Sequence, residues 1–166
     1  MASGAIPLRE GVMPLMRQCR DAGVCMGIAT TTSRSDLEAL MRAHLGCEWM
    51  QWFGAVVCGE DVTQKKPDPE VCAQALRALD VGLLDAVAIE DAPGGVAAAQ
   101  AAGIAVVVTR SAYFASAPIE GAIAVGPGLH QRRGWRPALE GDVDAGVSLS
   151  DIAARWSQRD SVSDYP

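Results

Sequence analysis

The chain has 166 residues, which is enough for one domain with a buried core, and 49% of them are hydrophobic. Its formal net charge of -6 argues against nucleic acid and against an anionic membrane surface as partners. No apolar run approaches the roughly 20 residues of a membrane-spanning helix. The five cysteines are odd in number and form no Cys-x-x-Cys pair, so we expect buried, reduced thiols in a cytoplasmic protein.

Apolar residues recur at helical spacing in some segments and form short continuous runs in others. The short runs predict strands at residues 24–30, 54–58, 86–90, 104–109 and 122–125. Helical spacing predicts helices at residues 12–22, 35–45, 69–79 and 94–102, before, between and after these strands. This alternation predicts an α/β fold with a parallel sheet that is covered by helices on both faces.

Polar residues predict where the helices begin. Ser35 and Glu38 have the spacing of a capping box, and Asp68 is expected to cap the helix of residues 69–79. Beyond Pro127, glycine, proline and charged residues dominate, with one short helix expected at about 150–156 behind Ser150 as its cap. We therefore divide the chain into an α/β domain (1–127), an irregular extension (128–156) and a tail expected to be disordered (157–166).

Two adjacent carboxylates, Glu90 and Asp91, directly follow an apolar strand. Neighbouring carboxylates repel each other unless a cation lies beside them, and Mg²⁺ is commonly held by one or two carboxylates together with water and substrate phosphate. The alternative is that Asp91 only caps the next helix, which has an open N-terminus at Gly94-Gly95. We favour metal binding, because an open helix start beside acids suits a phosphate that is bridged by a metal.

Lys65 and Lys66, in the segment Lys65-Lys66-Pro67-Asp68-Pro69, are the only lysines of the chain. A compact ammonium offers a point charge for a phosphate or carboxylate oxygen, whereas the alternative is an ordinary solvated pair of loop lysines. Thr30, Thr31, Thr32 and Ser33 place four hydroxyls at the end of the first strand. Hydroxyls and backbone amides there can bind phosphate oxygens, although Ser33 could serve only as a helix cap.

These segments resemble conserved motifs of the haloacid dehalogenase (HAD) superfamily. Ile28-Ala29-Thr30-Thr31-Thr32-Ser33, Lys65-Lys66-Pro67-Asp68-Pro69 and Glu90-Asp91 with Gly95 look like its motifs II, III and IV. Together with the lead-in Ile6–Val12, they look most like its CbbY-type sugar-phosphate phosphatases, near β-phosphoglucomutase. The resemblance extends from about Ile6 to Val125 and implies a Rossmannoid three-layer α/β/α fold.

The resemblance also implies a role for each motif residue. Thr30 and Lys66 would be catalytic, with Thr30 holding the transferring phosphoryl group and Lys66 neutralising its charge. Thr32 would support it, and from their hydroxyls we expect Thr31, Thr32 and Ser33 to bind the phosphate of a small phosphorylated sugar. Asp91 and Glu90 would bind Mg²⁺, Glu90 directly or through water. Such a hydrolase transfers the phosphoryl group to an aspartate, and water then cleaves the aspartyl-phosphate.

One part of the family pattern is absent from the sequence. No Asp-x-Asp follows an apolar strand upstream of Thr30, so the nucleophile, its strand and the substrate-selecting cap are missing. In this family that strand lies between those of residues 24–30 and 86–90, and we expect a gap between them. We therefore predict the C-terminal core part of a phosphatase, inactive alone, which a missing N-terminal segment or a complementary chain would complete. The alternative is a non-catalytic protein of the same fold that binds a phosphorylated ligand or a partner subunit.

Overall fold

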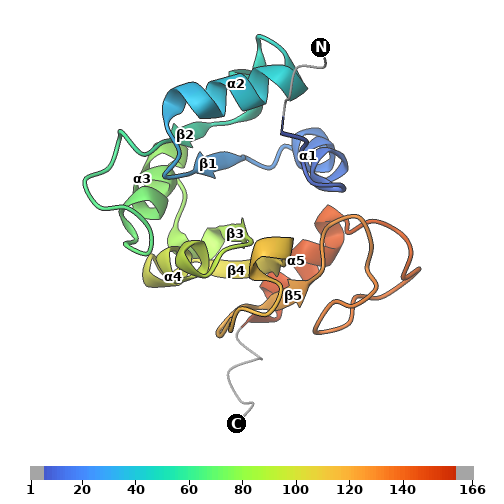
Figure 1. Ribbon diagram of the computed structural model, residues 1–166. Coiled ribbons are helices and arrows are strands. Elements are labelled where there is room, and N and C mark those ends of the chain that lie inside the picture. The colour runs from blue at the N-terminus through green and yellow to red at the C-terminus, as the bar shows by residue number, and fades with distance from the viewer. Residues whose placement is uncertain (1–5, 160–166) are drawn as a thin grey trace.

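The structure, a computed structural model, describes residues 6–159. Its five strands are all paired in parallel but form two separate sheets, which Figure 1 shows apart. One sheet holds β1 (Gly27–Ala29) and β2 (Ala55–Val57), and the other holds β3 (Val87–Glu90), β4 (Ala105–Thr109) and β5 (Ala124–Gly126), with β4 in the middle. Each strand lies within, or one residue beyond, a predicted strand, so the expected parallel α/β fold is confirmed.

Five α-helices accompany the strands in the described part of the chain: α1 (Val12–Asp21), α2 (Arg34–Leu45), α3 (Glu70–Leu79), α4 (Pro93–Ala101) and α5 (Leu149–Ser157). Short 3-10 turns follow at η1 (Trp49–Trp52), η2 (Leu83–Asp85) and η3 (Ala112–Phe114). Within residues 6–159, every helix is too short or too polar to cross a membrane.

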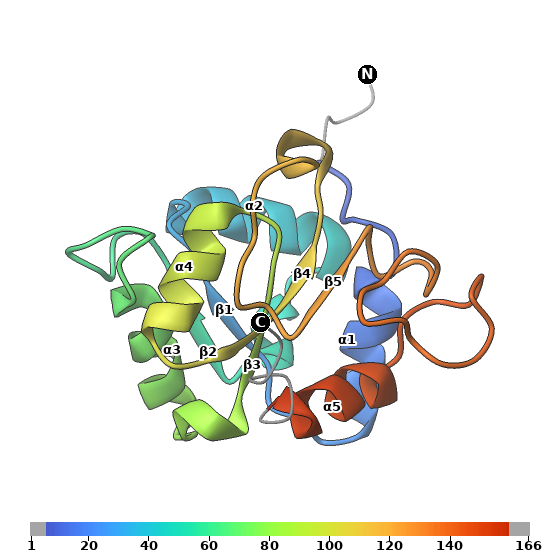
Figure 2. The ribbon, with the colours of Figure 1, turned by 90° about the horizontal axis from the view of Figure 1, so that it is seen from below.

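One face of both sheets is covered by α3 and α4, which also contact each other and so join the two sheets (Figures 1 and 2). Their buried residues, such as Val71 of α3 and Val96 of α4, form one apolar cluster with Val57 of β2 and with Val106 and Val108 of β4. This cluster is the continuous part of the core.

The opposite face is divided between two smaller clusters. There α2 covers β1 and β2 through Leu37 and Met41. The three-stranded sheet is covered on the same side by α1 and α5, whose Leu15 and Ile152 lie in one cluster with Val107 of β4. Helices thus lie on both sides of the strands, which gives the three-layer arrangement that the resemblance implies.

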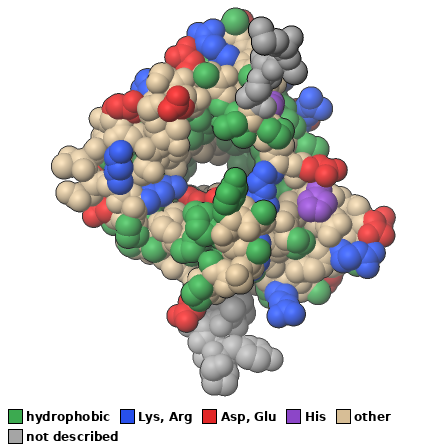
Figure 3. Space-filling model, viewed as in Figure 1, with side chains coloured by type: hydrophobic (Ala, Val, Ile, Leu, Met, Phe, Trp, Pro, Cys, Tyr) green, Lys and Arg blue, Asp and Glu red, His purple; other side chains and the backbone are tan. Residues whose placement is uncertain are grey.

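A gap separates β1 from β3, at the place where the resemblance puts a further strand. No sheet pairing joins these two strands within residues 6–159. Figure 3 shows an opening between the two halves of the molecule, with charged side chains at its margin. On the β3 side Ile89 is 42% exposed, which is high for a β-branched residue in the middle of a strand. An apolar side chain at an unpaired strand edge indicates a surface suited to further strand pairing.

Two predicted helix caps are wrong by two residues each. The side chain of Ser33, not Ser35, accepts the amide of Asp36 at 3.2 Å and caps α2. Glu38 instead forms an ion pair with Arg42 one turn later. In the same way Ser148, not Ser150, caps α5 in a capping box with Asp151.

The third predicted cap is correct in part. Pro69 occupies the N-cap position of α3, while Asp68 Oδ1 accepts the amide of Glu70 at 2.9 Å.

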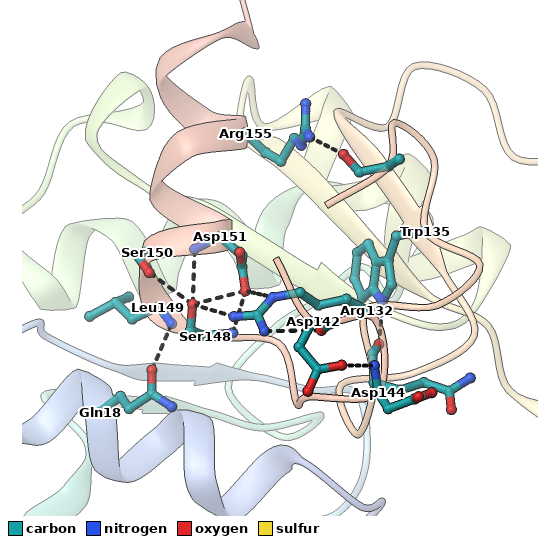
Figure 4. Close-up of polar contacts among 12 residues, drawn as sticks. Gln18, Arg132, Trp135, Asp142, Asp144, Ser148, Leu149, Ser150, Asp151 and Arg155 are labelled. Atoms are coloured by element: carbon teal, nitrogen blue, oxygen red, sulfur yellow. Dashed lines mark hydrogen bonds and ion pairs between the residues drawn. The ribbon is translucent and has the colours of Figure 1, made fainter. Parts of the chain in front are cut away.

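The extension after Pro127 packs on the domain through an apolar cluster that joins its Ile152 to Leu15 of α1, and a polar cluster, shown in Figure 4, adds hydrogen bonds. Arg132 donates from Nε to Asp151 at 2.9 Å, and Gln18 of α1 accepts the amide of Leu149 at 2.8 Å. Burial raises the pKa of Asp151, but hydrogen bonds from Ser148 and the Arg132 guanidinium together hold it below its usual value. The apolar cluster and the bond from Leu149 to Gln18 explain why a segment rich in glycine and charge still folds against α1.

Two further expectations, on the burial of the cysteines and on the start of the tail, need correction. All five cysteines are unpaired, but only Cys58 and Cys72 are buried, whereas Cys25 and Cys47 are exposed because they lie just outside β1 and α2. The expected disordered tail begins too early, since α5 includes Ser157, and residues 160–166 lie outside the described residues.

Candidate active site

The connection from β2 to α3 contacts the ends of both strands that face the gap. Near its start, Gly59 donates its amide to the carbonyl of Thr32, beyond β1, at 3.0 Å. Near its end, the Lys66 ammonium donates to Glu90 at the end of β3. This one connection therefore brings the motif residues of the two sheets toward a common region.

Lys66 and Glu90 form an ion pair whose side chains are only 16% and 17% exposed. A partly buried pair is screened less by solvent than a surface pair, and its geometry is correspondingly better fixed. The neighbouring Lys65 is exposed. Of the two lysines, Lys66 is thus the one that lies at the end of β3.

The Glu90 carboxylate lies directly over the first turn of α4. A Cβ at Gly95 would lie 2.2 Å from Glu90 Oε2, so any larger residue at this position would collide with the carboxylate. A Cβ at Gly94, by contrast, would meet nothing within 4 Å. Only Gly95 is required for the close approach of Glu90, which explains why the resemblance includes it.

Asp91 lines a pocket of about 400 Å³ together with Glu90 and Arg9. Its carboxylate has no hydrogen bond or ion pair with any described residue. The alternative role as a helix cap is excluded, because the N-cap of α4 is Ala92 and no side chain caps it. Asp91 is therefore a carboxylate at the end of a strand with no partner among residues 6–159.

The four residues after β1 differ in which of their polar groups are already engaged within the chain. Thr30 Oγ1 accepts the amide of Thr32 at 3.1 Å, which leaves the Thr30 hydroxyl proton available to a ligand. The carbonyl of Thr31 faces Gly59, and a Cβ at Gly59 would lie 2.5 Å from it. The Ser33 hydroxyl donates to Asp36 at 2.6 Å and is already engaged as the cap of α2.

The structure brings some of these residues together and leaves others apart. Lys66, Glu90 and Asp91 form one group, at the end of β3. Among the described residues, no hydrogen bond or ion pair links this group directly to Thr30, Thr31, Thr32 or Ser33. The two groups lie at the ends of strands on either side of the gap.

Glu70 is a contributing residue that the sequence reasoning did not identify. Its carboxylate accepts the amide of Thr63 on both oxygens, at 3.1 and 3.0 Å, and the amide of Gln64 at 2.6 Å. The amides of Gln64 and Thr63 hold the pKa of Glu70 below its usual value. These bonds fix the segment that leads into Lys66. An acid after Pro-Asp-Pro is the sequence signal that could have identified it.

Arg9 was also missed as an individual residue. It donates from Nη1 to the carbonyl and the hydroxyl of Thr109, both at 2.8 Å, and from Nη2 to the carbonyls of Arg110 and Pro127. It therefore ties the segment before α1 to the ends of β4 and β5. The contacts span 100 residues or more along the chain, which no local pattern reveals.

The donor set at the end of β3 fits Mg²⁺ in part. Within residues 6–159, no group of three or more His, Cys, Asp or Glu side chains could hold a metal ion. Mg²⁺ is nevertheless often bound by one or two carboxylates, with water and substrate phosphate as its remaining ligands. The unpartnered Asp91 meets this requirement, while the Glu90 carboxylate is shared with Lys66.

Comparisons with known proteins show which sequences this chain resembles. Residues 2–103 match the family model of haloacid dehalogenase-like hydrolases. The chain is 40% identical to the plasmid CbbY protein of Cupriavidus necator over 129 residues, which cover 78% of this chain and 51% of that protein. It is 34% identical to validoxylamine A 7'-phosphate phosphatase of Streptomyces hygroscopicus, over 67% of this chain and 51% of that enzyme.

A solved structure is similar over most of the chain. CbbY from Rhodobacter sphaeroides, crystallised as a mutant in complex with xylulose-(1,5)bisphosphate, superimposes with a TM-score of 0.78 at 32% identity. The similarity covers 91% of this chain and 61% of that one. The chain thus spans about half the length of the curated relatives it matches.

Proposed function

Because the chain belongs to the haloacid dehalogenase-like hydrolase family, we propose that it forms part of the active site of a magnesium-dependent sugar-phosphate phosphatase. The observation that carries the proposal is the partly buried Lys66–Glu90 ion pair beside the unpartnered Asp91. Together they offer a fixed cation and a free carboxylate at one strand end. A phosphoryl group and a divalent cation need this combination of charges.

Lys66 binds the phosphoryl oxygens in this proposal, and Glu90 keeps its ammonium in position. Asp91 binds Mg²⁺, with Glu90 assisting through water, and the bound metal would withdraw charge from the phosphoryl oxygens. The Thr30 hydroxyl, free to donate, binds the same phosphoryl group from the other side of the gap. Thr31 contributes its hydroxyl or amide, Thr32 contributes its hydroxyl because its amide is bound to Thr30, and Ser33 holds the start of α2.

The substrate class is a small phosphorylated sugar. Two relatives support this choice: a CbbY protein that binds xylulose-(1,5)bisphosphate and a phosphatase named for validoxylamine A 7'-phosphate. The nucleophilic aspartate of the family has no counterpart upstream of Thr30 in the 166 residues. We therefore expect the chain alone to be inactive, with the aspartate supplied on a strand that enters the gap between β1 and β3.

The test is to supply that strand. The N-terminal half of the Cupriavidus necator CbbY protein, fused ahead of this chain, is expected to release phosphate from xylulose-1,5-bisphosphate or another sugar phosphate when Mg²⁺ is present. Lys66→Met should lower the rate by about 10²–10³-fold, because it removes a charge that stabilises the transition state. Lys65→Met is the matched control and should leave the rate unchanged, since Lys65 is exposed.

Two results would contradict the proposal. A folded fusion with no phosphatase activity on any sugar phosphate tested would favour the non-catalytic binding role. Turnover by the 166-residue chain alone, abolished by Asp91→Asn, would show that the chain has its own nucleophile.

A further inference from the structure

A second cavity, of about 640 Å³, lies between the segment that follows β4 and the segment that follows β5. Arg110 and Ser111 line it from the first segment, and Arg136 lines it from the second. It shares no lining residue with the pocket that contains Asp91. Its volume lies within the range of small-molecule sites, which is about 300–1,000 Å³.

Both arginines are held against β5 by their backbones. The amide of Arg110 donates to the carbonyl of Gly126 at 2.8 Å. Arg136 and Val125 exchange two backbone hydrogen bonds, each of 2.8 Å. The two side chains therefore start from fixed points on one strand end, unlike arginines on a free loop.

The cavity carries positive charge with no acid to balance it. Within residues 6–159, no aspartate or glutamate lines it. The Arg136 side chain makes no hydrogen bond or ion pair with any residue from 6 to 159. Arg110 uses Nη1 to bind the carbonyls of Phe114, Ala115 and Ala117, and its other guanidinium nitrogens have no partner among the described residues.

Ser111 supplies a third polar group. Its hydroxyl oxygen is buried but has no hydrogen-bond partner within the described part of the chain. Buried polar atoms are almost always paired, so an unpaired one at a cavity wall points to a missing partner. An oxygen of a ligand inside the cavity would satisfy this hydroxyl.

We propose that this cavity is a second binding site, for the phosphate group of a small molecule, separate from the candidate active site. The guanidinium plane of Arg136 offers paired N–H donors that match two phosphate oxygens, and Arg110 and Ser111 offer further donors. Ala112, Ala115 and Val125 supply apolar walls for the organic part of a phosphate ester. An uncompensated pair of arginines in an acidic chain of net charge -6 is consistent with selection for an anion.

The test is a titration of the ¹⁵N-labelled full chain with inorganic phosphate and with phenyl phosphate, followed by amide chemical shifts. Saturable shifts are expected at Ser111, Val125 and Gly126, with tighter binding of phenyl phosphate if an ester is the true ligand. Arg136→Met should weaken the binding about tenfold or more, which corresponds to the loss of about 1.4 kcal/mol. Arg17→Met is the matched control, because it removes the same charge from an exposed arginine of α1.

Binding at this second site can be tested separately from the proposed phosphatase function. In a Lys66→Met background, phosphate-induced shifts near Lys66 and Glu90 should disappear while the shifts at Ser111 remain. If Arg136→Met alters the fold, Ser111→Ala replaces it and should weaken binding by removing only the hydroxyl. Equal shifts with sodium chloride at matched ionic strength, or equal affinity in Arg136→Met and Arg17→Met, would overturn the second site.

Discussion

The interior around β4 and the edges that face the gap are built from similar residues but have different surroundings. Val106, Val107 and Val108 of β4 are fully buried, since β4 is paired on both sides and covered by helices on both faces. Ile89 of the adjacent β3 is 42% exposed, because the outer edge of β3 is unpaired. The sequence of β3 therefore suits a central strand, whereas within residues 6–159 β3 is an edge strand.

The largest expected effect comes from truncating the filled interior. Val107→Ala should destabilise the chain by about 2–3 kcal/mol, because it removes two buried methyl groups and leaves a cavity. Ile89→Ala removes more atoms but should cost less than about 1 kcal/mol, since much of Ile89 already contacts water. Urea unfolding of the two variants measures the difference. Equal costs would mean that Ile89 is covered in solution.

A smaller effect is expected at the end of β3 that faces the gap. Gly95→Ala should destabilise the chain by about 1–3 kcal/mol, because the new methyl group would displace the Glu90 carboxylate from over α4. Gly94→Ala is the matched control and should be neutral or slightly stabilising, since nothing lies near its Cβ. Thermal unfolding compares them, and a loss of stability in Gly94→Ala as large as that in Gly95→Ala would refute the account.

The smallest effect is local and depends on pH. The pKa of Glu70 is lowered in the folded chain by the amides of Gln64 and Thr63. The stability that Glu70 contributes is therefore complete above its unfolded pKa, about 4.3, and is lost as the pH falls through its lower folded pKa. Amide chemical shifts of Thr63 and Gln64 should titrate in this acid range. Glu70→Gln should remove the titration, and its persistence in that variant would assign it to another group.

The sequence allowed the strands and the family to be predicted, because short apolar runs and polar residues at their ends are local patterns. The sequence could not decide between two neighbouring serines that both have the pattern of a helix cap. Both Ser33 and Ser35 are followed three residues later by an acid, and only the path of the chain from β1 makes Ser33 the cap. The strand predicted at 24–30 is shorter in the structure, because the parallel pairing begins only at Gly27 opposite Ala55.

Contacts between distant segments were beyond prediction for a different reason. The choice of Glu90 as the partner of Lys66 depends on how the connection before α3 returns to the end of β3. The sequence shows the charges but not the pairing, so the motif alone assigns both carboxylates to the metal. The structure leaves Asp91 as the one without a partner in the described part of the chain.

The most direct test of the central claim is whether one metal ion lies near the ends of both β1 and β3. Mn²⁺, which carboxylates bind as they bind Mg²⁺, broadens amide signals close to it and can replace Mg²⁺ in an NMR titration with inorganic phosphate. We expect broadening at Gly94 and Gly95 and also at Thr31 and Thr32, lost in Asp91→Asn but kept in the control Asp21→Asn. Broadening that persists in Asp91→Asn, or that never reaches Thr31 and Thr32, would contradict the account.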